Sequence, residues 1–259
     1  MNKSLRLDFY IVLGTILLSM PLVLLFQLRP LTSALLFFVT PSIYLALRKK
    51  KPIQEIIYGS LLIGGALGFI FDILATVNHA WYVPTSQLVI NYRIFGFWPV
   101  DEIIWFILWA SSILFFYEHF YERDRSDKIS TRYKYIALPS AIAFLAVLLI
   151  SYFSVEQLLI PYAYSLSVSL PIIFIVIYTA RNKPGLVLKF IKTGVFFFMV
   201  YLAHELTAMK LGQWEFSGQY IGWVQLFGLS FPFEELLFWM GLSPFVVLAI
   251  YEGFVDNAK

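Results

Sequence analysis

Residues 99–106 read Pro-Val-Asp-Glu-Ile-Ile-Trp-Phe, and residues 232–239 read Pro-Phe-Glu-Glu-Leu-Leu-Phe-Trp. Each stretch has a proline, one apolar residue and two adjacent acids, and a long apolar run follows. Proline suits the first turn of a helix, where its missing N–H loses no hydrogen bond. A charge at membrane depth costs at least about 2.5–3.5 kcal/mol, so these acids are functional candidates. Acids also complement the dipole at a helix start, but two copies in matching positions favour function.

The composition is typical of an α-helical membrane protein. The 259 residues are 60% hydrophobic and only 14% charged, which is too apolar for a soluble domain. Runs near the ~20 residues that a bilayer requires predict eight transmembrane helices. The predicted spans are 9–28, 31–47, 53–77, 99–120, 133–152, 158–178, 187–210 and 231–251. The first is too long for a signal peptide. We therefore expect an all-α polytopic membrane protein.

Charge and cysteine content exclude several classes of function. The chain has no cysteine, which rules out disulfides and thiolate chemistry. The net charge of +3 reflects membrane topology and does not indicate a nucleic-acid partner. Neither a phosphate loop nor a dinucleotide fingerprint occurs, so we expect no cofactor. His204-Glu205 resembles the start of a zinc-protease motif but lacks the second histidine, so we expect no metal.

Basic residues indicate the orientation in the membrane. On the side of the N-terminus they are Lys3, Arg6, Arg48, Lys49, Lys50, Lys51, Arg123, Arg125, Lys128, Arg132, Lys134, Arg181, Lys183, Lys189 and Lys192. The other side has only Arg29, Arg93 and Lys210. The positive-inside rule then predicts that both termini are cytoplasmic. We expect the protein to lie in the cell (plasma) membrane.

An internal repeat relates the two acidic stretches. An offset of 133 residues superposes Pro99 on Pro232, Asp72 on Glu205, Trp81 on Trp214, Asp101 on Glu234, Glu102 on Glu235 and Arg48 on Arg181. We therefore predict two four-helix repeats, 1–125 and 126–259. An even number of helices in each gives both the same orientation, with a pseudo-twofold axis along the membrane normal. The two acidic motifs would face each other across a central cavity.

The neighbourhood of these acids predicts acid chemistry in a dry cavity. Adjacent helical residues point about 100° apart, so one acid of each pair faces the cavity and the other faces a neighbouring helix. Apolar surroundings favour the neutral, protonated carboxyl group, which can then act as a Brønsted acid. Aromatic rings one turn further on stabilise a cation; they are Trp105, Phe106, Phe238 and Trp239. This combination suggests a reaction through a carbocation.

The same residues resemble the lycopene cyclase domain of the heterodimeric bacterial, archaeal and fungal type, here as a fused tandem of two domains. The first copy is carried by Asp72, Trp81-Tyr82 and Pro99-Val100-Asp101-Glu102. The second is carried by His204-Glu205, Gly212-Gln213-Trp214-Glu215-Phe216 and Pro232-Phe233-Glu234-Glu235-Leu236-Leu237-Phe238. Asp101 departs from the glutamate usual in the family, and Ile103-Ile104-Trp105 departs from the usual Phe-Leu-Phe.

The resemblance implies a carotenoid end-group cyclase, a non-redox isomerase or intramolecular lyase that needs no cofactor. It implies that Glu102 and Glu235 are proton donors, and that Asp101 and Glu234 tune the donor or accept the final proton. Asp72 and Glu205 would have a supporting role. Further supporting or substrate-binding residues are His204, Trp81, Trp214, Trp105 and Phe238. A lipophilic lycopene-type polyene would enter from the membrane lipids, with carotenoid-biosynthesis enzymes as partners.

Two alternatives stay open at this point. A non-enzymatic protein that binds a carotenoid or another isoprenoid would keep the cavity but not the acid geometry, and the altered first motif favours it. A proton-coupled transporter also has parallel repeats with facing acids, but it would need broken helices in mid-membrane.

Overall fold

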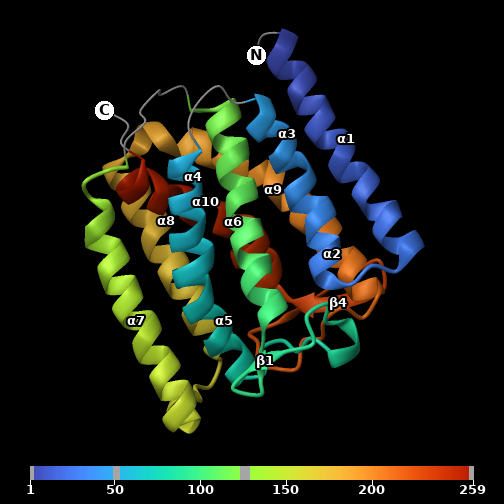
Figure 1. Cartoon of the computed structure of the whole chain (residues 1–259), viewed down its shortest axis with the longest axis vertical. Coiled ribbons are helices and arrows are strands. Elements are labelled where there is room, and N and C mark those ends of the chain that lie inside the picture. The colour runs from blue at the N-terminus through green and yellow to red at the C-terminus, as the bar shows by residue number, and fades with distance from the viewer. Residues whose placement is uncertain (1–2, 49–52, 123–128, 257–259) are drawn as a thin grey trace.

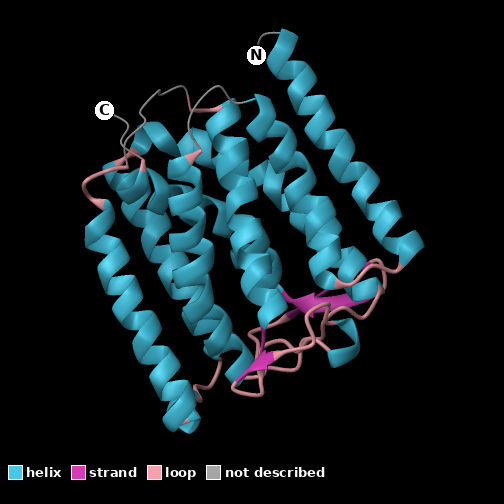
Figure 2. Ribbon diagram, viewed as in Figure 1, coloured by secondary structure: helices cyan, strands magenta, loops and turns pink. Residues whose placement is uncertain are grey.

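The computed structural model describes residues 3–48, 53–122 and 129–256, and these form a bundle of long helices (Figures 1 and 2). Eight helices in these ranges are long and apolar enough to cross a membrane. They are Lys3–Phe26, Pro30–Arg48, Gln54–Val77, Val100–Phe120, Tyr133–Phe153, Ser165–Asn182, Pro184–Lys210 and Glu235–Val255. The predicted class, an all-α polytopic membrane protein, is confirmed.

Several of these spans are built from more than one segment. The α-helices are α1 (Lys3–Phe26), α2 (Pro30–Ala34), α3 (Thr40–Arg48), α4 (Gln54–Ser60), α5 (Gly68–Val77), α6 (Val100–Phe120), α7 (Tyr133–Phe153), α8 (Leu170–Asn182), α9 (Pro184–Lys210) and α10 (Ser243–Ile250). Wider π-helical turns continue them at Leu35–Val39, Leu61–Leu67, Ser165–Ser169, Glu235–Leu242 and Tyr251–Val255. Short 3₁₀ turns lie at Thr85–Gln87 and Val155–Leu158.

Span boundaries differ from the predicted ones where other structure uses the apolar residues. The sixth span begins at Ser165 rather than 158, because a 3₁₀ turn and a loop precede it. The last begins at Glu235 rather than 231, because Leu229–Pro232 forms a strand. Apolar content alone does not distinguish a strand residue from the first turn of a helix.

Some predictions fall outside the described residues. They are the boundary between the two repeats at 125/126 and the basic residues Lys49, Lys50, Lys51, Arg123, Arg125 and Lys128. The two ends of the described chain lie at the top of the bundle in Figure 1, and the strands lie at the opposite end.

Two antiparallel hairpins form the end of the bundle that carries the acidic motifs. Strand β1 (Arg93–Ile94) pairs with β2 (Trp98–Pro99), and β3 (Trp223–Leu226) pairs with β4 (Leu229–Pro232). In the second hairpin Gly228 has φ +78°, a left-handed conformation that glycine adopts without strain. Each hairpin ends at the proline of its motif, so the two acids directly follow a fixed strand.

The hairpins belong to two long connections between spans, residues 78–99 (the first outer connection) and residues 211–234 (the second outer connection). These two connections also contact each other. Tyr82 and Glu215 exchange both backbone hydrogen bonds, each at 2.9 Å. These two residues are themselves 133 positions apart. A reciprocal contact between equivalent positions is what a two-fold relation produces. The division into two repeats stays a prediction.

Close packing fixes the helix that carries the first motif. A Cβ atom on Gly64 would lie 2.3 Å from the backbone oxygen of Phe106, so the third span and α6 touch through their main chains. Small residues allow such an approach between helices in a membrane. Phe106 and its neighbours belong to the largest apolar core cluster, which holds the beginning of α6 against the rest of the bundle.

Candidate functional site

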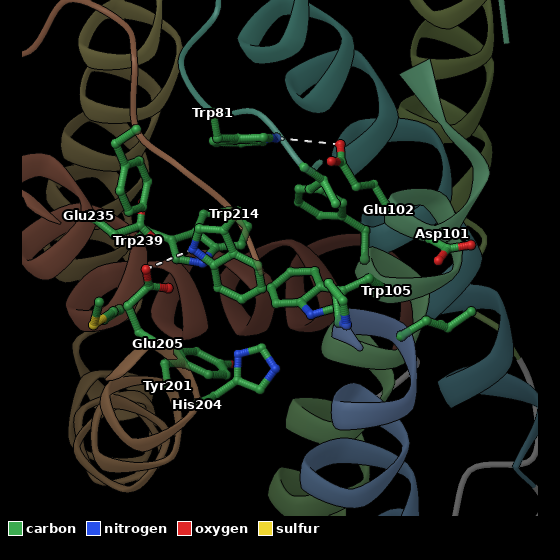
Figure 3. A pocket seen from close by; sticks show the side chains of 16 residues that line it. Trp81, Asp101, Glu102, Trp105, Tyr201, His204, Glu205, Trp214, Glu235 and Trp239 are labelled. Atoms are coloured by element: carbon green, nitrogen blue, oxygen red, sulfur yellow. Dashed lines mark hydrogen bonds between the residues drawn. The ribbon is translucent and has the colours of Figure 1, made fainter. Parts of the chain in front are cut away.

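A pocket with about 770 Å³ of empty space, mouth included, lies at the hairpin end of the bundle (Figure 3). Four spans and both outer connections contribute to its wall. The lining residues are Pro30, Leu31, Trp81, Val83, Asp101, Glu102, Trp105, Phe106, Tyr201, His204, Glu205, Trp214, Phe216, Glu235, Trp239 and Met240. Most of the wall is therefore apolar or aromatic, with a few acids.

The first acid of each motif holds an outer connection in place. The two carboxylate oxygens of Asp101 accept hydrogen bonds from the backbone N–H groups of Val89 (2.6 Å) and Ile90 (2.9 Å). Glu234 accepts from the backbone N–H of Ile221 (2.6 Å) and from the Ser165 hydroxyl (2.5 Å). Glu234 is fully buried and is not in the pocket wall. This geometry favours positioning roles for both acids over transfer of the final proton.

The second acid of each motif lines the pocket. Glu102 accepts a hydrogen bond from the indole N–H of Trp81 at 3.4 Å, and Glu235 accepts one from the hydroxyl of Tyr164. In Figure 3 the two glutamates lie on different sides of the same hollow. In the second motif the adjacent acids are therefore separated, since Glu235 lines the pocket and Glu234 does not, whereas in the first motif Asp101 also borders the pocket while its carboxylate binds the backbone of the neighbouring loop.

Each of these glutamates has a second carboxyl group beside it, from a residue 30 positions earlier in the chain. Asp72 is fully buried, interacts with Glu102 and accepts the indole N–H of Trp98 at 2.5 Å. Glu205 lines the pocket and interacts with Glu235. The carboxyl pairs that matter are therefore Asp72 with Glu102 and Glu205 with Glu235.

The tryptophans of the outer connections lie where the sequence places them. Trp81 and Trp214 both line the pocket, and Trp214 donates its indole N–H to Glu205 at 2.8 Å. Each outer connection thereby delivers one indole donor to one carboxyl pair. Interfacial anchoring alone would not direct both donors at acids of the pocket wall.

Aromatic rings form the wall between the two carboxyl pairs. Trp239 stacks on Trp109, with ring centroids 4.8 Å apart, and on Phe71, with centroids 5.6 Å apart. Trp105 lines the pocket as predicted. Phe238 does not line it; it packs against the separate apolar cluster around Ala75 and Tyr164.

The absence of Phe238 from the pocket wall has a local reason. Glu235–Leu242 is a π-helical stretch, so its turns are wider than those of an α-helix and the residue that shares the face of Glu235 is Trp239. Trp239 was in the predicted set of aromatic residues, but Phe238 was the one assigned to the site.

Tyr164 is a site residue that the sequence did not reveal. It lies directly before the sixth span, and its ring contacts those of Phe71, Trp81 and Tyr220. Burial raises the pKa of its hydroxyl well above the usual range, and the nearby charge of Glu235 raises it further. The hydroxyl therefore stays protonated and acts as a donor. The equivalent position in the first repeat is Leu31, so the repeat gave no signal for it.

A second acidic group lies outside the pocket, near the end of the last span. Ligand oxygens of Glu122, Glu252 and Asp256 lie within 4.8 Å of one another and have the chemistry to hold a cation. Lys189 contacts Glu122 at 3.1 Å, and the Tyr117 hydroxyl donates to Glu252. These contacts already supply partners within the protein.

Comparisons with known proteins give no match to any family model, curated protein or solved structure.

Proposed function

We propose that this protein is a carotenoid end-group cyclase that closes a ring at the end of a lycopene-type polyene. The observation that carries the proposal is the shared pocket, in which Glu102 and Glu235, each beside a second carboxyl group, lie in one aromatic wall. The resemblance to lycopene cyclase domains supplies the substrate class. No cofactor is required by this chemistry.

The reaction begins with a proton. Two neighbouring carboxyl groups in an apolar site cannot both carry a charge without a large cost, so one keeps its proton. Glu102 or Glu235 adds that proton to the terminal double bond and leaves a tertiary cation. The next double bond attacks this cation and closes a six-membered ring. A carboxylate then takes a proton from the ring, so the acid is restored and product and substrate are isomers.

The wall is suited to the cation. Indole faces attract a cation through their quadrupole, and Trp105 and Trp239 offer such faces beside the acids. Exclusion of water protects the intermediate from capture. The donors on the acids contribute too, since the Trp81 N–H and the Tyr164 hydroxyl stabilise the carboxylate that forms when the proton leaves.

The remaining acids support this arrangement. Asp101 and Glu234 hold the outer connections that deliver Trp81 and Trp214 to the pocket. The change from glutamate to aspartate in the first motif therefore affects a loop anchor and leaves the proton donor in place.

The setting of the reaction is part of the proposal. Eight apolar helices indicate an integral membrane protein. We propose the cell membrane, with both termini cytoplasmic, and two repeats that each supply one carboxyl pair. The polyene would enter from the lipid, delivered by other enzymes of carotenoid biosynthesis.

The test is expression of the full chain in a bacterial host that accumulates lycopene, with pigments separated by chromatography. We expect ring-closed product, and we expect Glu102→Gln and Glu235→Gln to lower its yield at least tenfold at equal protein level, since each removes one acid. Glu156→Gln is the control, because Glu156 is exposed in a turn outside the pocket. Unchanged lycopene that co-purifies with the protein would instead identify a carotenoid-binding protein.

A further inference from the structure

Two ring nitrogens in the pocket wall lack a hydrogen-bond partner among the described residues. They are Nε2 of His204 and Nε1 of Trp105, and both are buried. His204 is only 2% exposed. The centroids of the two rings are 5.9 Å apart, and Figure 3 shows both rings beside the same part of the hollow.

Such atoms are rare in folded proteins, because a buried donor or acceptor without a partner costs as much as a lost hydrogen bond. The two indoles from the outer connections differ in this respect. Trp81 donates to Glu102 and Trp214 donates to Glu205, so the protein satisfies them itself. The unpaired nitrogens therefore mark the part of the wall at which a polar group of a bound molecule is stabilised.

The hydrogen-bonding capacity of the two nitrogens determines which kind of polar group they can bind. The neutral imidazole has one donor and one acceptor nitrogen, and the indole N–H is a donor only. A hydroxyl group both donates and accepts, so it pairs with His204 in either tautomer while it accepts from Trp105. A carbonyl accepts only, and a hydrocarbon pairs with neither. The other rings in contact with His204 are those of Phe37, Phe38 and Trp214, at 5.1, 5.2 and 5.5 Å. The hydroxyl of Tyr201, in the same wall, also lacks a partner among the described residues and can bind the same group.

We propose that the pocket selects a polyene that carries a hydroxyl group, and that His204 and Trp105 bind this hydroxyl. The inference rests on the proposed function and narrows its substrate class from a plain hydrocarbon to a hydroxylated linear polyene. The position equivalent to His204 in the first repeat is Phe71, whose ring stands against Trp81 and Trp239. At this position, therefore, the second repeat offers a polar contact and the first repeat offers an apolar ring. The hydroxylated end of the substrate would bind at the second repeat and the hydrocarbon end at the first.

The experiment compares two probes that differ by one hydroxyl: lycopene and 1-hydroxylycopene. The full chain is purified in lipid nanodiscs, and affinity is measured from the quenching of tryptophan fluorescence. For the unmodified protein we expect 1-hydroxylycopene to bind about tenfold more tightly than lycopene, which corresponds to about 1.4 kcal/mol.

Substitutions assign the preference to the two rings. His204→Phe places in the second repeat the residue that the first repeat has, and we expect it to abolish the preference for the hydroxylated probe. Trp105→Phe keeps a ring but removes the N–H, and we expect it to lower the preference about threefold. His204→Gln restores a donor and an acceptor and should recover part of the preference. Thermal unfolding of each variant reports whether it folds.

Two results would overturn the inference. One is equal affinity of the unmodified protein for the two probes, as expected if a water molecule satisfies the nitrogens. The other is that folded His204→Phe and Trp105→Phe variants retain the full preference for the hydroxyl. Ring closure, measured separately, tests the proposed function: closure without a preference refutes this inference alone, and a preference without closure refutes only the cyclase.

Discussion

Substitution of Asp101 tests most directly whether the first acid of a motif positions a loop while the second acid takes part in the reaction. Asp101 is only 3% exposed, and its carboxylate accepts the backbone N–H groups of Val89 and Ile90 at 2.6 and 2.9 Å. Asp101→Asn replaces one acceptor oxygen by an NH₂ group, so one of the two amides loses its partner. Leaving a buried donor unsatisfied costs about 1–3 kcal/mol. We expect the first outer connection to open more often by the corresponding factor, roughly 5- to 150-fold.

Hydrogen exchange measured by mass spectrometry is the appropriate assay, because local opening sets the exchange rate of an amide. In Asp101→Asn the peptide that contains residues 88–92 should exchange faster by this factor, while the peptide around Ile221 stays unchanged. Glu234→Met is the matched variant, because one oxygen of Glu234 accepts both the N–H of Ile221 and the Ser165 hydroxyl, and Met removes this acceptor while it keeps the length of the side chain. It should show the opposite pattern.

The same variant separates positioning from catalysis. If Asp101 only holds the connection, ring closure per folded molecule should fall no more than about tenfold in Asp101→Asn. Complete loss of ring closure with unchanged exchange at residues 88–92 would show that Asp101 takes part in the chemistry and is not only an anchor for the loop.

Two further predictions follow from particular contacts. Gly64→Ala should lower the free energy of unfolding by about 1–3 kcal/mol or more, because its Cβ would lie 2.3 Å from the Phe106 backbone oxygen. Gly65→Ala is the control, because the space around its Cβ is open. Equal thermal stability of the two variants would contradict close packing at Gly64. Tyr164→Phe should slow ring closure roughly tenfold or more without unfolding the protein, because the hydroxyl donates to Glu235 and hydrogen bonds to charged groups contribute about 1.5–3 kcal/mol. An unchanged initial rate of product formation would remove Tyr164 from the mechanism.

Acids that are adjacent in the sequence do not form the carboxyl pairs of the site. Asp101 and Glu102 are adjacent in the chain and both border the pocket, yet the carboxylate of Asp101 is bound by the backbone of the outer connection. The group beside the Glu102 carboxyl is Asp72, from the preceding span. The offset of 133 residues identified Asp72 and Glu205 as special, but only the packing of the helices showed which acid each one pairs with.

The sequence by itself determined the class of this protein and its eight spans, because the need to bury backbone hydrogen bonds in lipid leaves only helices for runs of about 20 apolar residues. It also predicted that the two acids of each motif point in different directions, because the angle between adjacent helical residues is a local property. The tertiary structure alone decided what depends on distant segments or on a change of helical type. A π-helical stretch turned Phe238 away from the pocket wall, and helix packing brought Tyr164 to Glu235 and left the ring nitrogens of His204 and Trp105 without a partner among the described residues.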